Sequence, residues 1–303
     1  MRILVTGRNG QVGWELVRTL SALGEVIACD RERADLSRPQ TLKAVVEASR
    51  PDVLVNAAAY TAVDKAEEDH TSADTVNAQA VGVLAEAARS AGALFVHYST
   101  EYVFDGAKAS PYVESDAVNP LNVYGRTKLD GERAVRAAGG DWLVFRTSWV
   151  YGARGRNFLR TMLRLAGQRE TLSVVSDQIG APTSARAIAQ WTAHAVRQAI
   201  AERASGTFES GLFHLTANGQ TSWHGFATRI IEAAREALGD EAILTRRIEP
   251  IATSQYPTPA RRPSNSLLDN AAFERRFGLW RQPWDGALES VLEDVFERLR
   301  EPR

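Results

Sequence analysis

Cysteine is almost absent from this chain. The 303 residues include one, Cys29, which excludes an intrachain disulfide, and its place at the end of an expected strand favours inert packing. The five histidines are dispersed, and none has the spacing of metal ligands. The formal net charge is −1 with scattered arginines, so we expect neither a nucleic-acid nor a membrane partner. Long apolar runs are lacking too, and the short N-terminal one does not fit a signal peptide. The chain is therefore predicted to be cytoplasmic.

Lysine is also scarce, which makes the place of one of the four lysines informative. Lys128 follows Tyr124 after three intervening residues, a pairing that seven tyrosines and four lysines would rarely produce by chance. This spacing puts the two side chains one above the other on a helix face. An ammonium beside a phenol stabilises the phenolate and lowers the pKa of the tyrosine toward neutrality, as suits a general acid. On the spacing alone, a surface pair without chemistry is the alternative.

The N-terminal segment predicts a turn that binds a dinucleotide. A β-branched run at residues 2–6 indicates a buried strand, and three glycines, Gly7, Gly10 and Gly13, precede a helix at 14–23. Glycines permit a tight turn and the close approach of backbone to a pyrophosphate, which the N–H groups of the helix N-terminus would face. The spacing is G-x-x-G-x-x-G and not the G-x-G-x-x-G of many dehydrogenases.

Asp30 stands at the end of a second expected strand, residues 25–29. A carboxylate at this distance from the glycines can accept hydrogen bonds from an adenosine ribose, although a turn residue is the alternative. Arg31 and Arg33 follow, and an arginine there can bind the 2′-phosphate of NADP, which Asp30 would repel. The choice between NADH and NADPH therefore stays open.

Strands and helices alternate through the N-terminal half. Further strands are expected at 52–56, 94–98 and 142–146, with helices at 71–91 and around Tyr124. This alternation predicts an α/β fold with a Rossmann-type, doubly wound parallel sheet. Ligands of such sheets bind at the carboxyl ends of the strands, so the residues that follow these strands should surround one crevice. They include Thr61, Thr100 and Trp149.

The alternation weakens beyond about Tyr151. Helices are expected at 157–167, 185–201, 222–238 and 287–299, short strands at 173–175 and 212–214, and an ordered proline-rich loop at 249–266. We therefore predict two domains. Residues 1–150 would bind NAD(P), and residues 151–303 would form mainly a smaller α/β substrate lobe, with the chain free to cross between the two.

These residues support a resemblance to the extended short-chain dehydrogenase/reductases, through the glycine triplet, Asn77, Thr100 and the Tyr124–Lys128 pair. Within that group the chain is similar to the dTDP-4-dehydrorhamnose reductases over nearly its whole length. The matching segments are residues 10–16, 55–64, 97–104, 119–125, 146–151, 177–183 and 256–263. The most specific are Ser-Trp-Val-Tyr-Gly, Gly-Ala-Pro-Thr and Tyr-Pro-Thr-Pro-Ala.

The resemblance implies that dTDP-4-dehydro-β-L-rhamnose is reduced to dTDP-β-L-rhamnose by NADPH or NADH, the last step of dTDP-rhamnose biosynthesis. Tyr124 would protonate the C4 alkoxide, Lys128 would hold the nicotinamide ribose and lower the pKa of Tyr124, and Thr100 would hydrogen-bond the same oxygen. The substrate would touch Thr100, Glu101 and Trp149. The implied cofactor contacts are Gly7, Gly10, Gln11, Val12, Gly13, Asp30, Asp35, Leu36, Ala59, Tyr60, Thr61, Tyr124 and Lys128.

Two positions depart from the pattern of that family. Members often carry Asp where this chain has Glu101, which sets the carboxylate one methylene further out. Some members bind magnesium at a dimer interface through a Glu that matches Glu15 and an acidic pair after Gly-Ala-Pro-Thr, but here the second stretch reads Ser-Ala-Arg-Ala-Ile around Arg186. We expect no magnesium at that position. Monomer and homodimer both stay open.

Two other functions fit the same residues. One is a reductase or epimerase of another nucleotide-linked keto sugar, which would use the same catalytic groups. The other is a non-catalytic, NADP-binding regulatory subunit of a methionine adenosyltransferase. The presence of Thr100, Tyr124 and Lys128 argues against a purely structural role.

Overall fold

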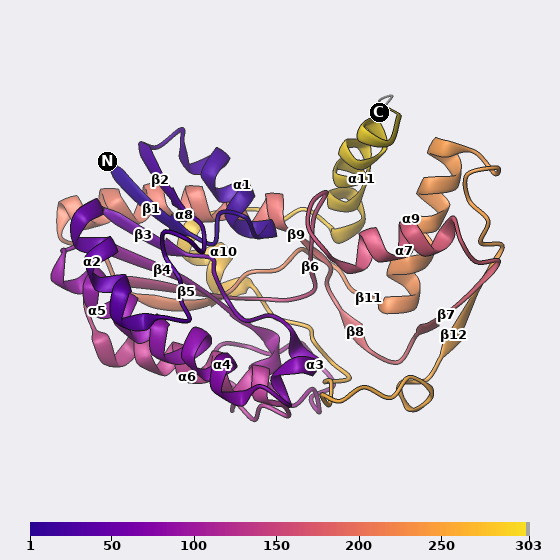
Figure 1. Cartoon of the computed structure of the whole chain (residues 1–303), viewed down its shortest axis with the longest axis horizontal. Helices are drawn as coiled ribbons and strands as arrows, with labels where there is room; N and C mark the ends of the chain where they lie inside the picture. The colour runs from indigo at the N-terminus through magenta and orange to yellow at the C-terminus, as the bar shows by residue number, and fades with distance from the viewer. Residues whose placement is uncertain (301–303) are drawn as a thin grey trace.

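Six parallel strands form the main sheet in the computed structural model, which describes residues 1–300 (Figure 1). They are β1 (Arg2–Thr6), β2 (Glu25–Cys29), β3 (Val53–Asn56), β4 (Leu94–Thr100), β5 (Trp142–Thr147) and β10 (Gly211–His214). Their order is β10-β5-β4-β3-β1-β2. The strand order reverses at β1 and β3, where the crevice of a doubly wound sheet opens. The predicted fold class is confirmed.

Helices cover both faces of this sheet. One face carries α2 (Pro39–Ser49), α5 (Ala80–Ser90) and α6 (Val123–Ala138), and the other carries α1 (Gln11–Leu20), α8 (Ala185–Ser205) and α10 (Ala271–Phe277). Because successive strand residues point to opposite faces, Ile3 and Val5 join the cluster under α1 and α8, whereas Leu4 joins the cluster under α2 and α5. Strand β1 is therefore apolar on both sides, as a sheet buried between two helical layers requires.

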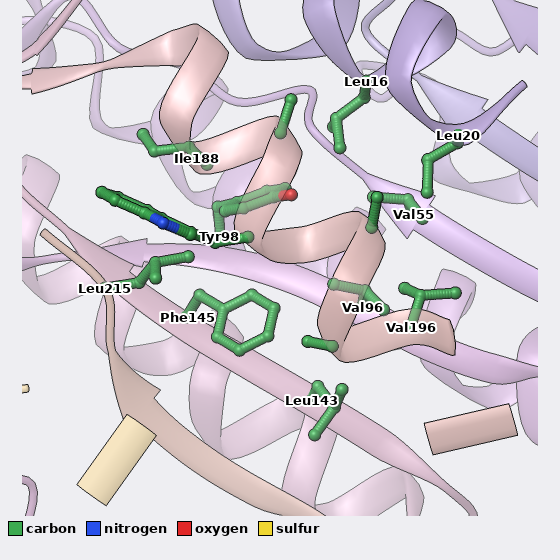
Figure 2. Packing of buried hydrophobic residues seen from close by; sticks show 14 of the residues in the cluster. Leu16, Leu20, Val55, Val96, Tyr98, Leu143, Phe145, Ile188, Val196 and Leu215 are labelled. Atoms are coloured by element: carbon green, nitrogen blue, oxygen red, sulfur yellow. The ribbon is translucent and has the colours of Figure 1, made fainter. Parts of the chain in front are cut away.

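Figure 2 shows the cluster on the α1 and α8 side. Leu16 and Leu20 of α1 and Ile188 and Val196 of α8 lie over strand residues such as Phe145, all buried. In the same layer, the Tyr98 hydroxyl lies 2.7 Å from the Thr192 hydroxyl of α8. A helix from the C-terminal half of the chain thus completes the core of the N-terminal sheet.

The helix predicted at 71–91 is interrupted. The structure has α4 (His70–Asp74), a π-helical segment η1 (Thr75–Gln79) and then α5, with Asn77 inside the π segment. A short helix α3 (Val63–Ala66) precedes them. A π-bulge inside a helix is often found at functional sites.

A second group of elements lies on the right of Figure 1. It comprises α7 (Phe158–Ala166), α9 (Trp223–Leu238), α11 (Trp284–Arg300), and the parallel pair β7 (Thr171–Val175) and β12 (Arg247–Ile251). Buried Leu159, Phe226 and Leu288 share one apolar cluster there. The proline-rich segment 249–266 was predicted to be a loop, but its start belongs to β12. Pro250 is tolerated there because the sheet has only two strands, so each is an edge.

The remaining elements are short. They are β6 (Val150–Tyr151) paired with β9 (Thr183–Ser184), β8 (Ile179–Gly180) paired with β11 (Thr221–Ser222), and the 3₁₀ turns η2 (Glu101–Val103) and η3 (Thr253–Gln255).

Part of the range 151–303 joins the main sheet, since α8, β10 and α10 all come from it. The division at residue 150 stays a prediction, and residues 301–303 of the second range lie outside the described residues. Within residues 1–300, no helix combines the length and the apolar character needed to cross a membrane.

Candidate active site

The glycine turn between β1 and α1 is too tight for side chains at two positions. Gly7 has φ 71°, and a Cβ there would lie 2.8 Å from the Ala58 nitrogen. A Cβ on Gly13 would lie 2.1 Å from the Gly7 carbonyl oxygen. Helix α1 begins at Gln11, and the first N–H groups of a helix have no partner within it. The turn is therefore a backbone cradle that fits a pyrophosphate.

Asp30 follows β2 and organises the next turn. Its Oδ1 accepts hydrogen bonds from the backbone N–H groups of Glu32 at 3.1 Å and Arg33 at 3.2 Å. Asp30 therefore stabilises a turn, which was the alternative to a ribose contact, and it does so through one carboxylate oxygen. Arg31 lies 3.3 Å from Asp35 and is 81% exposed, and Leu36 is buried beside this turn. A ribose contact by Asp30 stays a prediction.

Asn77 fixes the segment after β3, which holds Ala59, Tyr60 and Thr61. The Asn77 Oδ1 accepts the Tyr60 N–H at 2.9 Å, and Nδ2 donates to the Tyr60 carbonyl at 3.0 Å. The same Nδ2 donates to Thr127 Oγ1 of α6 at 3.2 Å. The side-chain amide of Asn77 therefore links the predicted cofactor loop at Tyr60 to α6, the helix that carries Tyr124.

Thr100, Glu101 and Tyr124 meet at the carboxyl end of β4. The Thr100 hydroxyl donates to Glu101 Oε2 at 2.7 Å, and both Glu101 and Thr100 act on the pKa of Tyr124. Tyr124 lies in the first turn of α6, whose N-cap Asn122 accepts the Gly125 N–H at 2.8 Å. A Cβ on Gly125 would lie 2.2 Å from the Tyr102 carbonyl oxygen, so glycine lets α6 approach η2 closely.

Burial dominates the electrostatics of this cluster. Burial raises the pKa of Tyr124 above its usual value, the Glu101 carboxylate raises it further, and the neighbouring Thr100 hydroxyl opposes the rise. Glu101 is 3% exposed, and burial raises its pKa to about 7 against the opposing Thr100 hydrogen bond. The carboxyl group therefore changes its charge near neutral pH.

Lys128 does not act on Tyr124 as the sequence predicted. Its Nζ donates to the Tyr98 carbonyl at 2.6 Å and lies 3.4 Å from His97 Nε2. Burial lowers the pKa of Lys128 to about 8, with Glu132 opposing. The predicted lowering of the Tyr124 pKa is wrong for the chain by itself, because the amine turns toward β4 and burial penalises the phenolate.

Trp149, just after β5, has φ 48°, in the region that favours glycine. Its indole stacks on Trp223 of α9 with ring centroids 3.6 Å apart. The Trp223 Nε1 donates to Gln178 Oε1 at 3.2 Å. No local pattern in the sequence points to Trp223. Gln178 and His97 had no predicted role, although both lie in matched segments.

Arg186, which replaces an expected acid, pairs with Asp294 of α11. Among residues 1–300, no three His, Cys, Asp or Glu side chains are grouped so as to hold a metal ion. The expectation of no magnesium stays a prediction.

The chain matches the family model described as RmlD substrate binding domain over residues 1–297. It is 57% identical over 298 residues to the dTDP-4-dehydrorhamnose reductase of Burkholderia thailandensis, which covers 98% of this chain and 100% of the relative. The Escherichia coli K12 enzyme of that name is 45% identical over 300 residues, 98% of each chain.

Solved structures agree with these sequence matches. A dTDP-4-dehydrorhamnose reductase of Clostridium acetobutylicum superposes with a TM-score of 0.87 and 38% identity, covering 97% of this chain and 99% of that one. The Bacillus anthracis enzyme in complex with NADP gives a TM-score of 0.85 and 31% identity over the same shares.

Proposed function

We infer the function from the premise that this chain belongs to the dTDP-4-dehydrorhamnose reductase family: it is an oxidoreductase that converts dTDP-4-dehydro-β-L-rhamnose to dTDP-β-L-rhamnose with NADPH or NADH. This is the last step of dTDP-rhamnose biosynthesis. The observation that carries the inference is the cluster of Thr100, Glu101 and Tyr124, in which Thr100 donates to Glu101, at the same sheet edge as the glycine turn.

The glycine turn and the cluster have different proposed roles: the turn binds the cofactor, and the cluster acts on the substrate oxygen. The fit of the cradle at Gly7 and Gly13 to a pyrophosphate supports cofactor binding there, with Gly10, Gln11 and Val12 at the helix N-terminus. When bound, the reduced nicotinamide supplies the hydride that adds to C4 of the keto sugar. The remaining roles belong to side chains of the chain itself.

Tyr124 donates its proton to the alkoxide that develops on O4, and Thr100 donates a hydrogen bond to the same oxygen. Donors aimed at a developing charge are usually the largest electrostatic contribution to a rate. Lys128 holds the nicotinamide ribose, Asp30 the adenosine ribose, and Glu101 and Trp149 contact the sugar nucleotide. Asp35, Leu36, Ala59, Tyr60 and Thr61 complete the cofactor contacts.

We further propose that the enzyme works in the cytoplasm, as a monomer or homodimer. The exposed Arg31 and Arg33 beside Asp30 support acceptance of both NADPH and NADH.

The test follows the absorbance of NADPH and NADH when the protein meets dTDP-4-dehydro-β-L-rhamnose. Tyr124→Phe should bind NADPH normally and lose about 10²- to 10⁴-fold in kcat, since it lacks only the proton donor. Tyr151→Phe is the matched control, because the buried Tyr151 hydroxyl has no hydrogen-bond partner among the described residues. No oxidation by a folded protein that binds either cofactor would instead favour another keto sugar or a regulatory subunit.

A further inference from the structure

A buried row of polar side chains runs across the main sheet and ends at Lys128. Thr6, Asn56 and His97 are register neighbours on β1, β3 and β4. Thr6 Oγ1 donates to Asn56 Oδ1 at 2.6 Å, Asn56 Nδ2 lies 3.1 Å from His97 Nδ1, and His97 Nε2 lies 3.4 Å from Lys128 Nζ. All four side chains are at most 2% exposed. Polar groups this deeply buried are retained where each one orients the next.

The row fixes which nitrogen of His97 carries its proton. The backbone N–H of Ala58 can only donate, and it lies 3.3 Å from Asn56 Oδ1, so the amide oxygen faces Ala58 and Thr6. The amide nitrogen then donates to His97 Nδ1, which must accept. Burial, together with the nearby Lys128, lowers the pKa of His97 well below its usual value, so the ring is neutral. Its single proton is therefore on Nε2, the nitrogen that faces Lys128.

An N–H at that position discriminates between the two charge states of Lys128. An ammonium group has three donors and no acceptor, whereas a neutral amine has a lone pair that can accept from His97. The amine can still donate to the Tyr98 carbonyl at 2.6 Å. We propose that His97 is a positioning residue that acts through Lys128, by fixing its amine against β4 and weakening its ammonium form. The inference rests on the proposed reductase function, which places Lys128 at the nicotinamide ribose.

The other ionisable groups near Lys128 do not account for the proposed effect of His97 on its ammonium form. Glu132, one turn further along α6, opposes the fall in the pKa of Lys128, but both of its carboxylate oxygens are bonded to Arg146 of β5. Glu101 on η2 is bonded to Thr100, and Glu67 beside α3 accepts the Val123 N–H. The phenols are Tyr124 on α6 and Tyr98 on β4, and the Tyr98 hydroxyl lies by Thr192. Burial lowers the pKa of Lys128 to about 8, so its charge is lost as the pH rises through that value.

The experiment measures the dissociation constant of NADPH by fluorescence between pH 7 and pH 10, in the full chain. Wild-type binding should weaken above about pH 8, when Lys128 loses its charge. His97→Gln can turn its amide oxygen toward Lys128 and accept from the ammonium, so the midpoint should rise by about one pH unit. Asn56→Leu removes the donor that fixes the His97 tautomer. His97 Nε2 can then accept from Lys128, so the midpoint of this variant should also lie above the wild-type midpoint. His194→Gln, on the exposed side of α8, is the control and should keep the wild-type midpoint.

A raised midpoint in the folded variants supports the proposal, and a wild-type midpoint in either folded variant overturns it. If one variant does not fold, the other decides. The dissociation constant of NADPH is measured without turnover. Failure to reduce the keto sugar would therefore count against the proposed function, but the binding midpoints would still test the role of His97. A purely structural role for His97 would lower the melting temperature without moving the midpoint.

Discussion

Trp149 and Trp223 stack face to face, with ring centroids 3.6 Å apart and 11° between the ring planes. Trp149 keeps a left-handed backbone at φ 48°, which costs free energy that its contacts must offset. Gly180 belongs to the same arrangement, because a Cβ there would lie 2.5 Å from the Trp149 ring. The indole predicted to contact the sugar nucleotide is therefore held between Trp223 and Gly180.

The first prediction uses that close approach. Gly180→Ala should push the Trp149 ring aside and raise KM for the sugar nucleotide about tenfold, a free-energy change of about 1.4 kcal/mol. The affinity for NADPH should stay unchanged. Steady-state kinetics and NADPH titration separate the two. Gly167→Ala is the control, since its Cβ would meet the Ala242 carbonyl oxygen at an ordinary 3.5 Å. An unchanged KM in Gly180→Ala would remove Trp149 from the substrate site.

Glu101 should make stability depend on pH. Its pKa is about 7 in the folded chain against a usual 4.5, so the folded state holds more protons between these values and loses stability as the pH rises through them. Glu101→Gln lacks this penalty. Relative to wild type, its free energy of unfolding should gain about 3 kcal/mol between pH 4.5 and pH 7, at about 1.4 kcal/mol per pKa unit.

Urea denaturation at several pH values measures that difference, with Glu86→Gln on the exposed side of α5 as the control. The same titration should affect turnover. An ionised Glu101 accepts the hydrogen bond of the Thr100 hydroxyl, whereas a protonated one leaves that hydroxyl free to donate elsewhere. A pH-independent difference between Glu101→Gln and wild type would show that the pKa of Glu101 is the same in the folded and the unfolded chain.

The cofactor cradle gives a third prediction. Gly13→Ala puts a Cβ 2.1 Å from the Gly7 carbonyl oxygen, so the turn must open and the affinity for NADPH should fall by about two orders of magnitude. Gly82→Ala, in α5, is the control, because its Cβ meets only the Ala134 Cβ at 3.4 Å. Fluorescence titration gives the affinity, and thermal melting shows whether the variant folds. Normal NADPH binding in a folded Gly13→Ala would place the pyrophosphate elsewhere.

Local patterns explain why much of the fold was predictable. The apolar strands, the glycine turn and the Tyr124 helix are each specified by residues that are close in sequence, so β1, β4 and α6 were found near their true positions. The close contact of Gly13 with Gly7 is local as well. Joining these pieces into one parallel sheet then followed from general rules of connection.

The features that were missed depend on contacts between distant segments. Strand β10 joins the main sheet by pairing with β5, which its own sequence does not reveal. Trp223 reaches Trp149 only through the packing of α9, whose residues are far from Trp149 in sequence. The direction of the Lys128 amine is set by the Tyr98 carbonyl and by His97, contacts between α6 and β4 that the spacing from Tyr124 does not reveal.

The last prediction concerns the ion pair that anchors the catalytic helix to the sheet. Arg146 of β5 donates to both carboxylate oxygens of Glu132 of α6 at 2.8 and 2.7 Å, and the two side chains are 3% and 2% exposed. Arg146→Leu leaves the carboxylate buried without its partner and should cost about 3–5 kcal/mol of unfolding free energy. The double variant with Glu132→Leu removes both charges and should cost less than Arg146→Leu alone. Arg133→Leu breaks the exposed pair with Asp130 on the same helix and should cost at most about 1 kcal/mol. Urea denaturation of the wild type, Arg146→Leu, Glu132→Leu and the double variant completes the cycle, with Arg133→Leu as the control. Additive losses would mean that the pair does not hold α6 in place.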